Sequence, residues 1–94
     1  MQYKISKLSN IYDLDIDIMI YPNPAVDYLN VMVSDIDKAN NYFMYDMSGK
    51  LIRQERINDK EFKIGFSALS TGNYMLVFMD NDRKLKTIKF QKSH

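Results

Sequence analysis

The stretch Ile20–Val31 constrains the fold more than any other part of the sequence, because it contains both prolines of the chain. Pro22 and Pro24 each fix φ and lack a backbone N–H, so neither a helix nor a central strand can continue through them. We therefore expect one strand to end at this corner and the next to begin after Asp27. We also expect the Asp27 side chain to hydrogen-bond within the turn.

Apolar residues alternate with polar or exposed ones on both sides of the corner, which is the period of a half-buried strand. This alternation runs from Leu14 to Tyr21 before the corner and from Leu29 to Val33 after it. Farther along, Tyr42–Met47 and Tyr74–Met79 are apolar on both faces. We expect the latter two strands in the middle of a sheet, with packing over each side.

Two glycines mark bends between these segments. In the turn after Tyr45, Asp46 can bond neighbouring amides, and Gly49 can adopt a positive φ without a Cβ penalty. Gly72 marks a second bend just before Tyr74. The Tyr74 hydroxyl is placed to bond back to the main chain as in a tyrosine corner, although Tyr74 is equally explained as an ordinary core residue.

These segments amount to about seven strands at a spacing of roughly 8–12 residues, with no segment of convincing helical period. That spacing predicts an all-β domain, an immunoglobulin-like antiparallel β-sandwich of about seven strands. We expect residues 13–94 to form this domain and residues 1–12 to be a linker or an extra edge strand. The charged return strand Leu51–Ile57 is expected at a sheet edge.

Composition argues against catalysis and against several kinds of ligand. The chain has no cysteine, and its one histidine is the last residue, so no nucleophile and base pair can be assembled; we expect no enzyme and no cofactor. Five basic residues in the last twelve are too few for a nucleic-acid surface, and no apolar run is long enough to span a bilayer. A surface calcium site at Asp13, Asp15 and Asp17 stays open beside their interpretation as the solvated face of a strand.

The ordered set of Tyr21–Ala25, Asp27, Leu29–Val31, Tyr45–Lys50, Leu69 with Gly72–Tyr74 and a lysine-rich last strand resembles a known family. It is similar to the C-terminal sorting domain, type A, of proteins secreted by the type IX (Por) secretion system of Bacteroidetes. The resemblance extends from about Ile18 to Lys92. It implies a fold determined by the corner, the two glycine bends and the last strand.

The resemblance also implies a function and its partners. The domain would be a secretion signal that directs an N-terminal passenger of the same precursor across the outer membrane to the cell surface, where it is secreted or anchored. Its partners would be the type IX translocon and shuttle proteins and a sortase-like surface peptidase, with no membrane insertion of its own. The residues implied in the motif or its recognition are Pro22, Asn23, Pro24, Asp27, Gly49, Gly72, Tyr74, Lys86, Lys89 and Lys92.

The sequence shows neither a signal peptide nor a passenger. We therefore expect it to be the tail of a larger precursor, with a standalone reading frame as the alternative explanation. The rival function from a different class is a carbohydrate- or surface-binding module of fibronectin type III kind, for which the seven tyrosines supply candidate stacking side chains.

Overall fold

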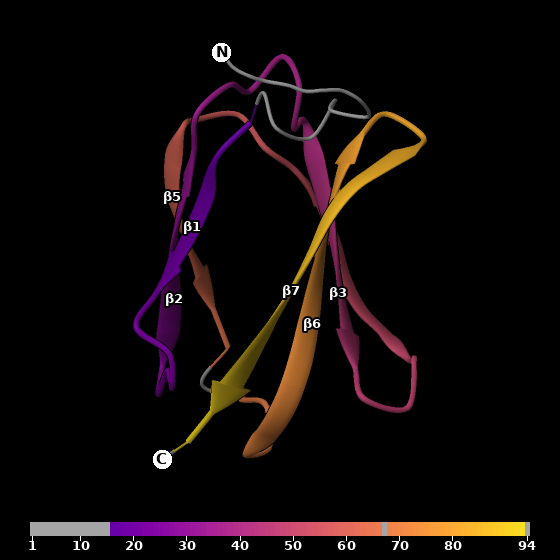
Figure 1. The fold of residues 1–94 in the computed structure, drawn as a ribbon. Helices are drawn as coiled ribbons and strands as arrows, with labels where there is room; N and C mark the ends of the chain where they lie inside the picture. Colours follow the sequence, from indigo (N-terminus) through magenta and orange to yellow (C-terminus); the bar gives the residue numbers. More distant parts are fainter. Residues whose placement is uncertain (1–15, 67, 94) are drawn as a thin grey trace, which may run out of the picture.

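The computed structural model describes residues 16–66 and 68–93, and these residues form seven strands and no helix. The strands pack as two antiparallel sheets, one of three strands in the order β1-β2-β5 and one of four in the order β4-β3-β6-β7 (Figure 1). In chain order they are β1 (Ile18–Tyr21), β2 (Tyr28–Val33), β3 (Asn41–Asp46), β4 (Leu51–Arg56), β5 (Glu61–Gly65), β6 (Gly72–Asp80) and β7 (Arg83–Lys92). The predicted all-β sandwich is therefore confirmed.

The two sheets bury the side chains that the alternation predicted. In β2, Leu29, Val31 and Val33 are buried, whereas Tyr28 and Met32, which point to the other face of the strand, are exposed. Each fully buried aliphatic or aromatic side chain contributes about 1.5–3 kcal/mol relative to an exposed one. The largest of these side chains come from both sheets and are Tyr42, Phe78, Phe90, Leu29, Met44, Ile64, Leu76 and Val31.

Tyr42 shows how the core accommodates a polar group. Its ring packs against Phe62 and Phe78, at centroid distances of 5.9 and 6.3 Å. Its hydroxyl donates a 2.7 Å hydrogen bond to Glu55 Oε1 on β4. Burial and the neighbouring Glu55 carboxylate both raise the pKa of the Tyr42 hydroxyl, so the group stays protonated and keeps donating.

The central position of β3 and β6 is confirmed, and the outward-facing Val77 of β6 is buried, but the prediction that both faces are covered is wrong for β3. Each lies between two other strands in the four-stranded sheet. On β3, Tyr42 and Met44 are buried under the opposite sheet, whereas Phe43 and Tyr45 on the outer face are only half-buried. A two-layer sandwich covers one face of each sheet, so an apolar outer face is left without a covering layer among the described residues.

The ends of some elements also differ from the prediction. The first described strand begins at Ile18 rather than Leu14. The predicted linker, residues 1–12, and two of the three candidate calcium ligands, Asp13 and Asp15, lie outside the described residues, and the third, Asp17, is exposed. Gly72, with φ of 152°, is the first residue of β6 rather than part of a preceding turn. The lysine-rich last strand extends from Arg83 to Lys92.

The β3–β4 turn forms as the sequence predicts. Asp46 Oδ1 accepts hydrogen bonds from the backbone N–H groups of Ser48 and Lys50 at 2.9 and 3.0 Å, and from the Ser48 hydroxyl at 2.6 Å. Gly49 has φ of 90°, a value that disfavours a side chain. The turn delivers the chain to β4, which lies at a sheet edge as predicted.

Candidate functional site: the corner and the last strand

The proline corner docks onto the end of β7, in the opposite sheet. The Ala25 N–H donates to the Gln91 carbonyl at 2.8 Å, and the Ser93 N–H donates to the Ala25 carbonyl at 2.7 Å. Ala25 thus forms a parallel bridge with Lys92 and is fully buried. The corner at the start of the fold and the last strand of the chain are therefore one structural unit, the corner–β7 junction (Figure 1).

Asn23 completes this junction with its side chain. Pro22 and Pro24 have no N–H to offer to a neighbouring strand, and the Asn23 Oδ1 instead accepts a 3.0 Å hydrogen bond from the Gln91 N–H. Both backbone groups of Gln91 are thereby used by the corner. Because an unpaired strand edge is open to other strands, the junction closes the edge of β7 at this end.

Tyr74 supports the same end of β7 from the other side. Its hydroxyl donates to the Ser70 carbonyl at 2.5 Å, four residues earlier, so the predicted bond back to the main chain is confirmed. Its ring lies 5.7 Å from that of Phe90, and Phe90 also contacts Phe66 at a centroid distance of 5.4 Å. Gly72 pairs with Lys92 in the β6–β7 ladder. The Gly72 bend, the tyrosine and the junction thus meet at one end of the sandwich.

Gly49 and the Asp27 side chain take no part in the corner–β7 junction. Gly49 lies in the β3–β4 turn, and the strand order separates that turn from β7 by β6. Asp27 is exposed, and its carbonyl accepts a hydrogen bond from the Phe66 N–H at 3.0 Å. The predicted hydrogen bond from the Asp27 carboxylate within the turn is absent among the described residues.

The three β7 lysines that the resemblance implied have different environments. Lys86 and Lys89 are exposed, while Lys92 is buried and follows the inward alternation of Ile88 and Phe90. Lys86 lines a groove of about 450 Å³ whose other lining residues include Asp17 and Met19 at the edge of the three-stranded sheet. Of these three, Lys86 and Lys89 present accessible charge, as do Arg83 and Lys84 at the start of the same strand.

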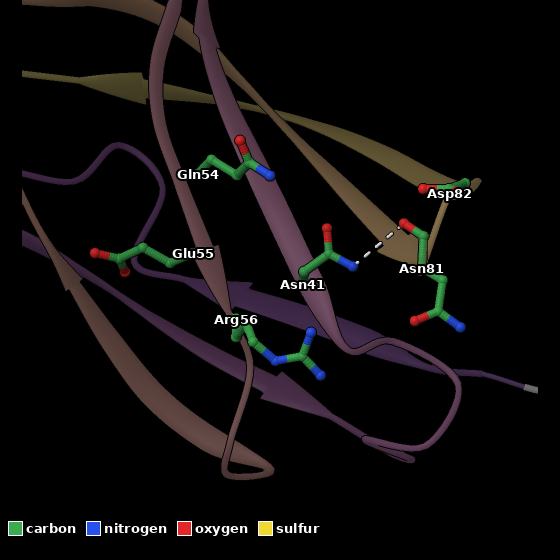
Figure 2. A pocket seen from close by; sticks show the side chains of 6 residues that line it. All are labelled: Asn41, Gln54, Glu55, Arg56, Asn81 and Asp82. Atoms are coloured by element: carbon green, nitrogen blue, oxygen red, sulfur yellow. Dashed lines mark hydrogen bonds between the residues drawn. The ribbon is translucent and has the colours of Figure 1, made fainter.

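A polar groove of about 350 Å³ lies at the far end of the four-stranded sheet (Figure 2). Asn41 Nδ2 donates to the Asn81 carbonyl at 3.4 Å, which ties the β6–β7 hairpin to the start of β3. The Glu55 side chain points away from Asn41 and Asn81 and is engaged by Tyr42. The residues that line the groove are Asn41, Gln54, Glu55, Arg56, Asn81 and Asp82.

This groove lacks the side chains of the common pairs of nucleophile and base. Its lining lacks histidine, serine and cysteine, and a nucleophile activated by an adjacent base is what covalent catalysis requires. Within the part of the chain that the structure describes, no three histidine, cysteine or carboxylate residues cluster as metal ligands. Across residues 16–66 and 68–93 there is also no helix that could cross a membrane.

Sequence reasoning missed the two residues on which the junction depends most. Ala25 was visible within the corner, but nothing local shows that its N–H and carbonyl both bond to β7. Nothing in the sequence around Gln91 indicates that its backbone groups bond to the corner. The contacts between the corner and the end of β7 join residues more than 60 positions apart in the chain, and only the packed sheets bring them together.

Comparison with known proteins gives one match. The family model described as "Secretion system C-terminal sorting domain" matches residues 19–92. These residues include six complete strands and all but the first residue of β1, so the match covers the sandwich together with the corner–β7 junction. Comparison with curated proteins and with solved structures gave no match.

Proposed function

Because the chain belongs to the family of type IX secretion system C-terminal sorting domains, we propose that it directs an attached N-terminal passenger through the outer-membrane translocon. The observation that carries the proposal is that the family match spans the whole folded sandwich rather than a short motif. A family with this role is a sorting signal and not a catalyst. The passenger reaches the cell surface as part of a larger precursor.

The later steps of export belong to the same proposal. The translocon and its shuttle proteins recognise the folded domain, a sortase-like surface peptidase removes it, and the passenger is anchored at the surface. The domain is thus a substrate of these proteins, which recognise its surface. The corner–β7 junction supports this role, because the conformation of the last strand depends on residues at the start of the fold.

A reporter fusion tests the proposal. The full chain is placed behind a reporter with an export signal peptide, in a Bacteroidetes strain with an intact type IX system and in a matched strain without the translocon. We expect the reporter at the surface or in the medium in the first strain and in the periplasm in the second. A reporter that stays in the periplasm of the intact strain, attached to a folded domain, would contradict the proposal.

The roles of the β7 lysines are tested in the same assay. We propose that Lys86 and Lys89 contact the export machinery, because they are the exposed ones among the three last-strand lysines that the resemblance implied. Charge reversal at both positions is expected to reduce surface delivery while leaving the domain folded. The matched control reverses Lys60 and Lys63, which are exposed on the opposite side of the sandwich near and on β5. Equal loss with both pairs would assign the effect to net charge alone.

One observation favours a second candidate function, carbohydrate binding. Tyr21 and Tyr28 are each 43 % exposed and lie on the outer face of the three-stranded sheet, with Asn30 opposite Tyr21. Lys63 Nζ lies 4.6 Å from the Tyr28 ring centroid and covers one face of that ring. Binding of the isolated chain to a glycan array, lost in Tyr21→Ala, would support this function.

A further inference from the structure

The outer face of the four-stranded sheet carries a continuous apolar row. Paired residues in a ladder share a face, and the register places Phe43 opposite Val77 and Tyr45 opposite Met75. The Phe43 and Tyr45 rings stack at 6.1 Å with an interplanar angle of 11°. Leu51, opposite Tyr45 on β4, is 46 % exposed and extends the row toward the sheet edge.

This row forms the floor of a groove of about 400 Å³. Methionine is flexible and polarisable, so a methionine-rich floor adapts to side chains of different shape. The groove is open along the sheet and is large enough for a few side chains but not for a folded element. Its lining residues are Phe43, Tyr45, Gly49, Met75, Val77, Met79, Lys84 and Thr87.

The charged side chains that border the apolar row are lysines. On β7, Lys89 is opposite Met75 and Lys84 is opposite Met79, so both residues border the apolar row. Arg56, opposite Asn41 at the start of the outward alternation of β3, lines the separate polar groove together with Asp82. The carboxylates of the same strands, such as Glu55 opposite Tyr42, occupy positions of the inward alternation. The outward positions of the four strands therefore hold three cations and no carboxylate.

We propose that this face, the outer groove, binds an extended protein segment whose sheet-facing side chains are apolar in the middle and carboxylates at the two ends. The apolar side chains contact the groove floor, and the end carboxylates meet Lys84 and Lys89 along β7. Only every second side chain of the segment takes part, because successive side chains of an extended segment point to opposite sides. The inference does not depend on the proposed secretion role, since it concerns the groove of the isolated domain.

Other anionic partners fit this face less well. Recognition of anionic lipid headgroups takes clusters of roughly four to eight lysines or arginines, and the outer groove is bordered by two lysines, both on β7. A nucleic acid or a polyanionic sugar is bound chiefly through its charges and gains little from an apolar floor. The combination of an apolar centre and a sparse cationic rim is matched by a peptide segment.

An NMR titration of the full chain tests the proposal. The probe is a capped seven-residue peptide with glutamate at positions 1 and 7, leucine at positions 3 and 5 and serine at the positions between them, and the control peptide has lysine in place of each glutamate. We expect the glutamate peptide to shift the amide signals of β3, β6 and β7 around Phe43, Met75 and Val77, and the lysine peptide to shift none of them. Shifts on the three-stranded sheet instead, or equal shifts with both peptides, would overturn the proposal.

Two double variants of equal net charge separate the rim from general electrostatics. Lys84→Glu with Lys89→Glu is expected to weaken binding of the glutamate peptide about tenfold or more, because two attractive contacts become repulsive. Lys60→Glu with Lys63→Glu is expected to leave the affinity unchanged. Circular dichroism and urea unfolding check that both double variants are folded. Equal weakening in both would overturn the assignment.

Vesicles of phosphatidylglycerol provide the remaining comparison. If they shift the signals of the outer groove while the glutamate peptide does not, the face binds lipid and the proposal is wrong. If the peptide binds and the vesicles leave the spectrum unchanged, the protein segment is the supported partner. Failure of surface export in the reporter assay changes neither outcome, because the titration uses only the purified chain.

Discussion

The proline corner and the β3–β4 turn both reverse the chain between neighbouring antiparallel strands, yet different parts of the molecule hold them. In the β3–β4 turn, one carboxylate, that of Asp46, accepts three hydrogen bonds from residues at most four positions away. In the corner, Asn23 and Ala25 bond to Gln91 and Ser93. The turn is thus stabilised locally, and the corner is stabilised by the opposite sheet.

This difference has a consequence for how the two bends respond to change. A local turn keeps its hydrogen bonds whenever its own few residues adopt the right backbone conformation. Contacts between distant residues form only once the intervening chain has been ordered, and that ordering costs conformational entropy. Damage to the corner should therefore affect the whole sandwich, whereas damage to the turn should stay local.

The largest effect is expected from Ala25→Leu. Ala25 is fully buried, and its N–H and carbonyl both bond to the end of β7, so a larger side chain must push the corner away from the strand. Overpacking of this kind costs about 1–3 kcal/mol. Urea unfolding measures the loss, and Val26→Leu, at a neighbouring residue that is 45 % exposed, is the matched control. Equal unfolding free energies for the two variants would show that the junction contributes nothing to stability.

A smaller effect is expected from Asn23→Ala. The substitution leaves the Gln91 N–H without the acceptor that lies 3.0 Å away in the native protein, and a hydrogen bond of this type contributes about 0.5–1.5 kcal/mol. Asn23→Asp retains an acceptor and should restore most of the stability. Hydrogen exchange of the Gln91 amide provides an independent measurement. Unchanged exchange in Asn23→Ala would mean that the side chain does not protect this group.

The same distinction explains what could be predicted from the sequence. Alternation identified the buried faces of β2 and the edge position of β4, because strand period and charge act within a few residues. The β3–β4 turn was predicted with its hydrogen-bonding residue, Asp46, for the same reason. The Tyr74 hydroxyl bond was also anticipated, since its partner Ser70 lies four residues earlier.

The remainder depends on packing, which no local pattern contains. Nothing in the sequence pairs Asn23 with Gln91 or distinguishes the buried Lys92 from the exposed Lys89, because both facts follow from where β7 lies relative to the corner. The apolar pattern of β3 was interpreted as burial on both faces, yet only the arrangement of layers shows that Phe43 and Tyr45 are left on an outer face. The predicted Asp27 hydrogen bond was wrong because residue type alone was used to assign it.

Acid should affect the β3–β4 turn through one group. The hydrogen bonds from the Ser48 hydroxyl and the Lys50 N–H lower the pKa of the Asp46 carboxyl below its ordinary value of 3.8. A group whose pKa is lower in the folded state adds stability above its unfolded pKa, and that stability is lost as the pH falls through the folded pKa. Asp46→Asn removes this dependence, so the stability difference between the native protein and the variant should shrink in urea titrations from about pH 6 to about pH 2. A difference that stays constant over this range would exclude the Asp46 charge as its cause.

The smallest change is expected from Asp27→Ala, although Asp27 belongs to the same corner as Ala25. Its carboxylate is exposed and has no hydrogen-bond partner among the described residues, and alanine keeps the carbonyl that accepts from Phe66. The unfolding free energy should therefore stay within about 0.5 kcal/mol of the native value. A loss above about 1 kcal/mol would show that the carboxylate stabilises the corner after all. If Asp27→Ala is stable but delivers less reporter to the surface, the Asp27 side chain acts in recognition. The corner then has two roles, because its backbone holds the end of β7 and its carboxylate contacts the export machinery.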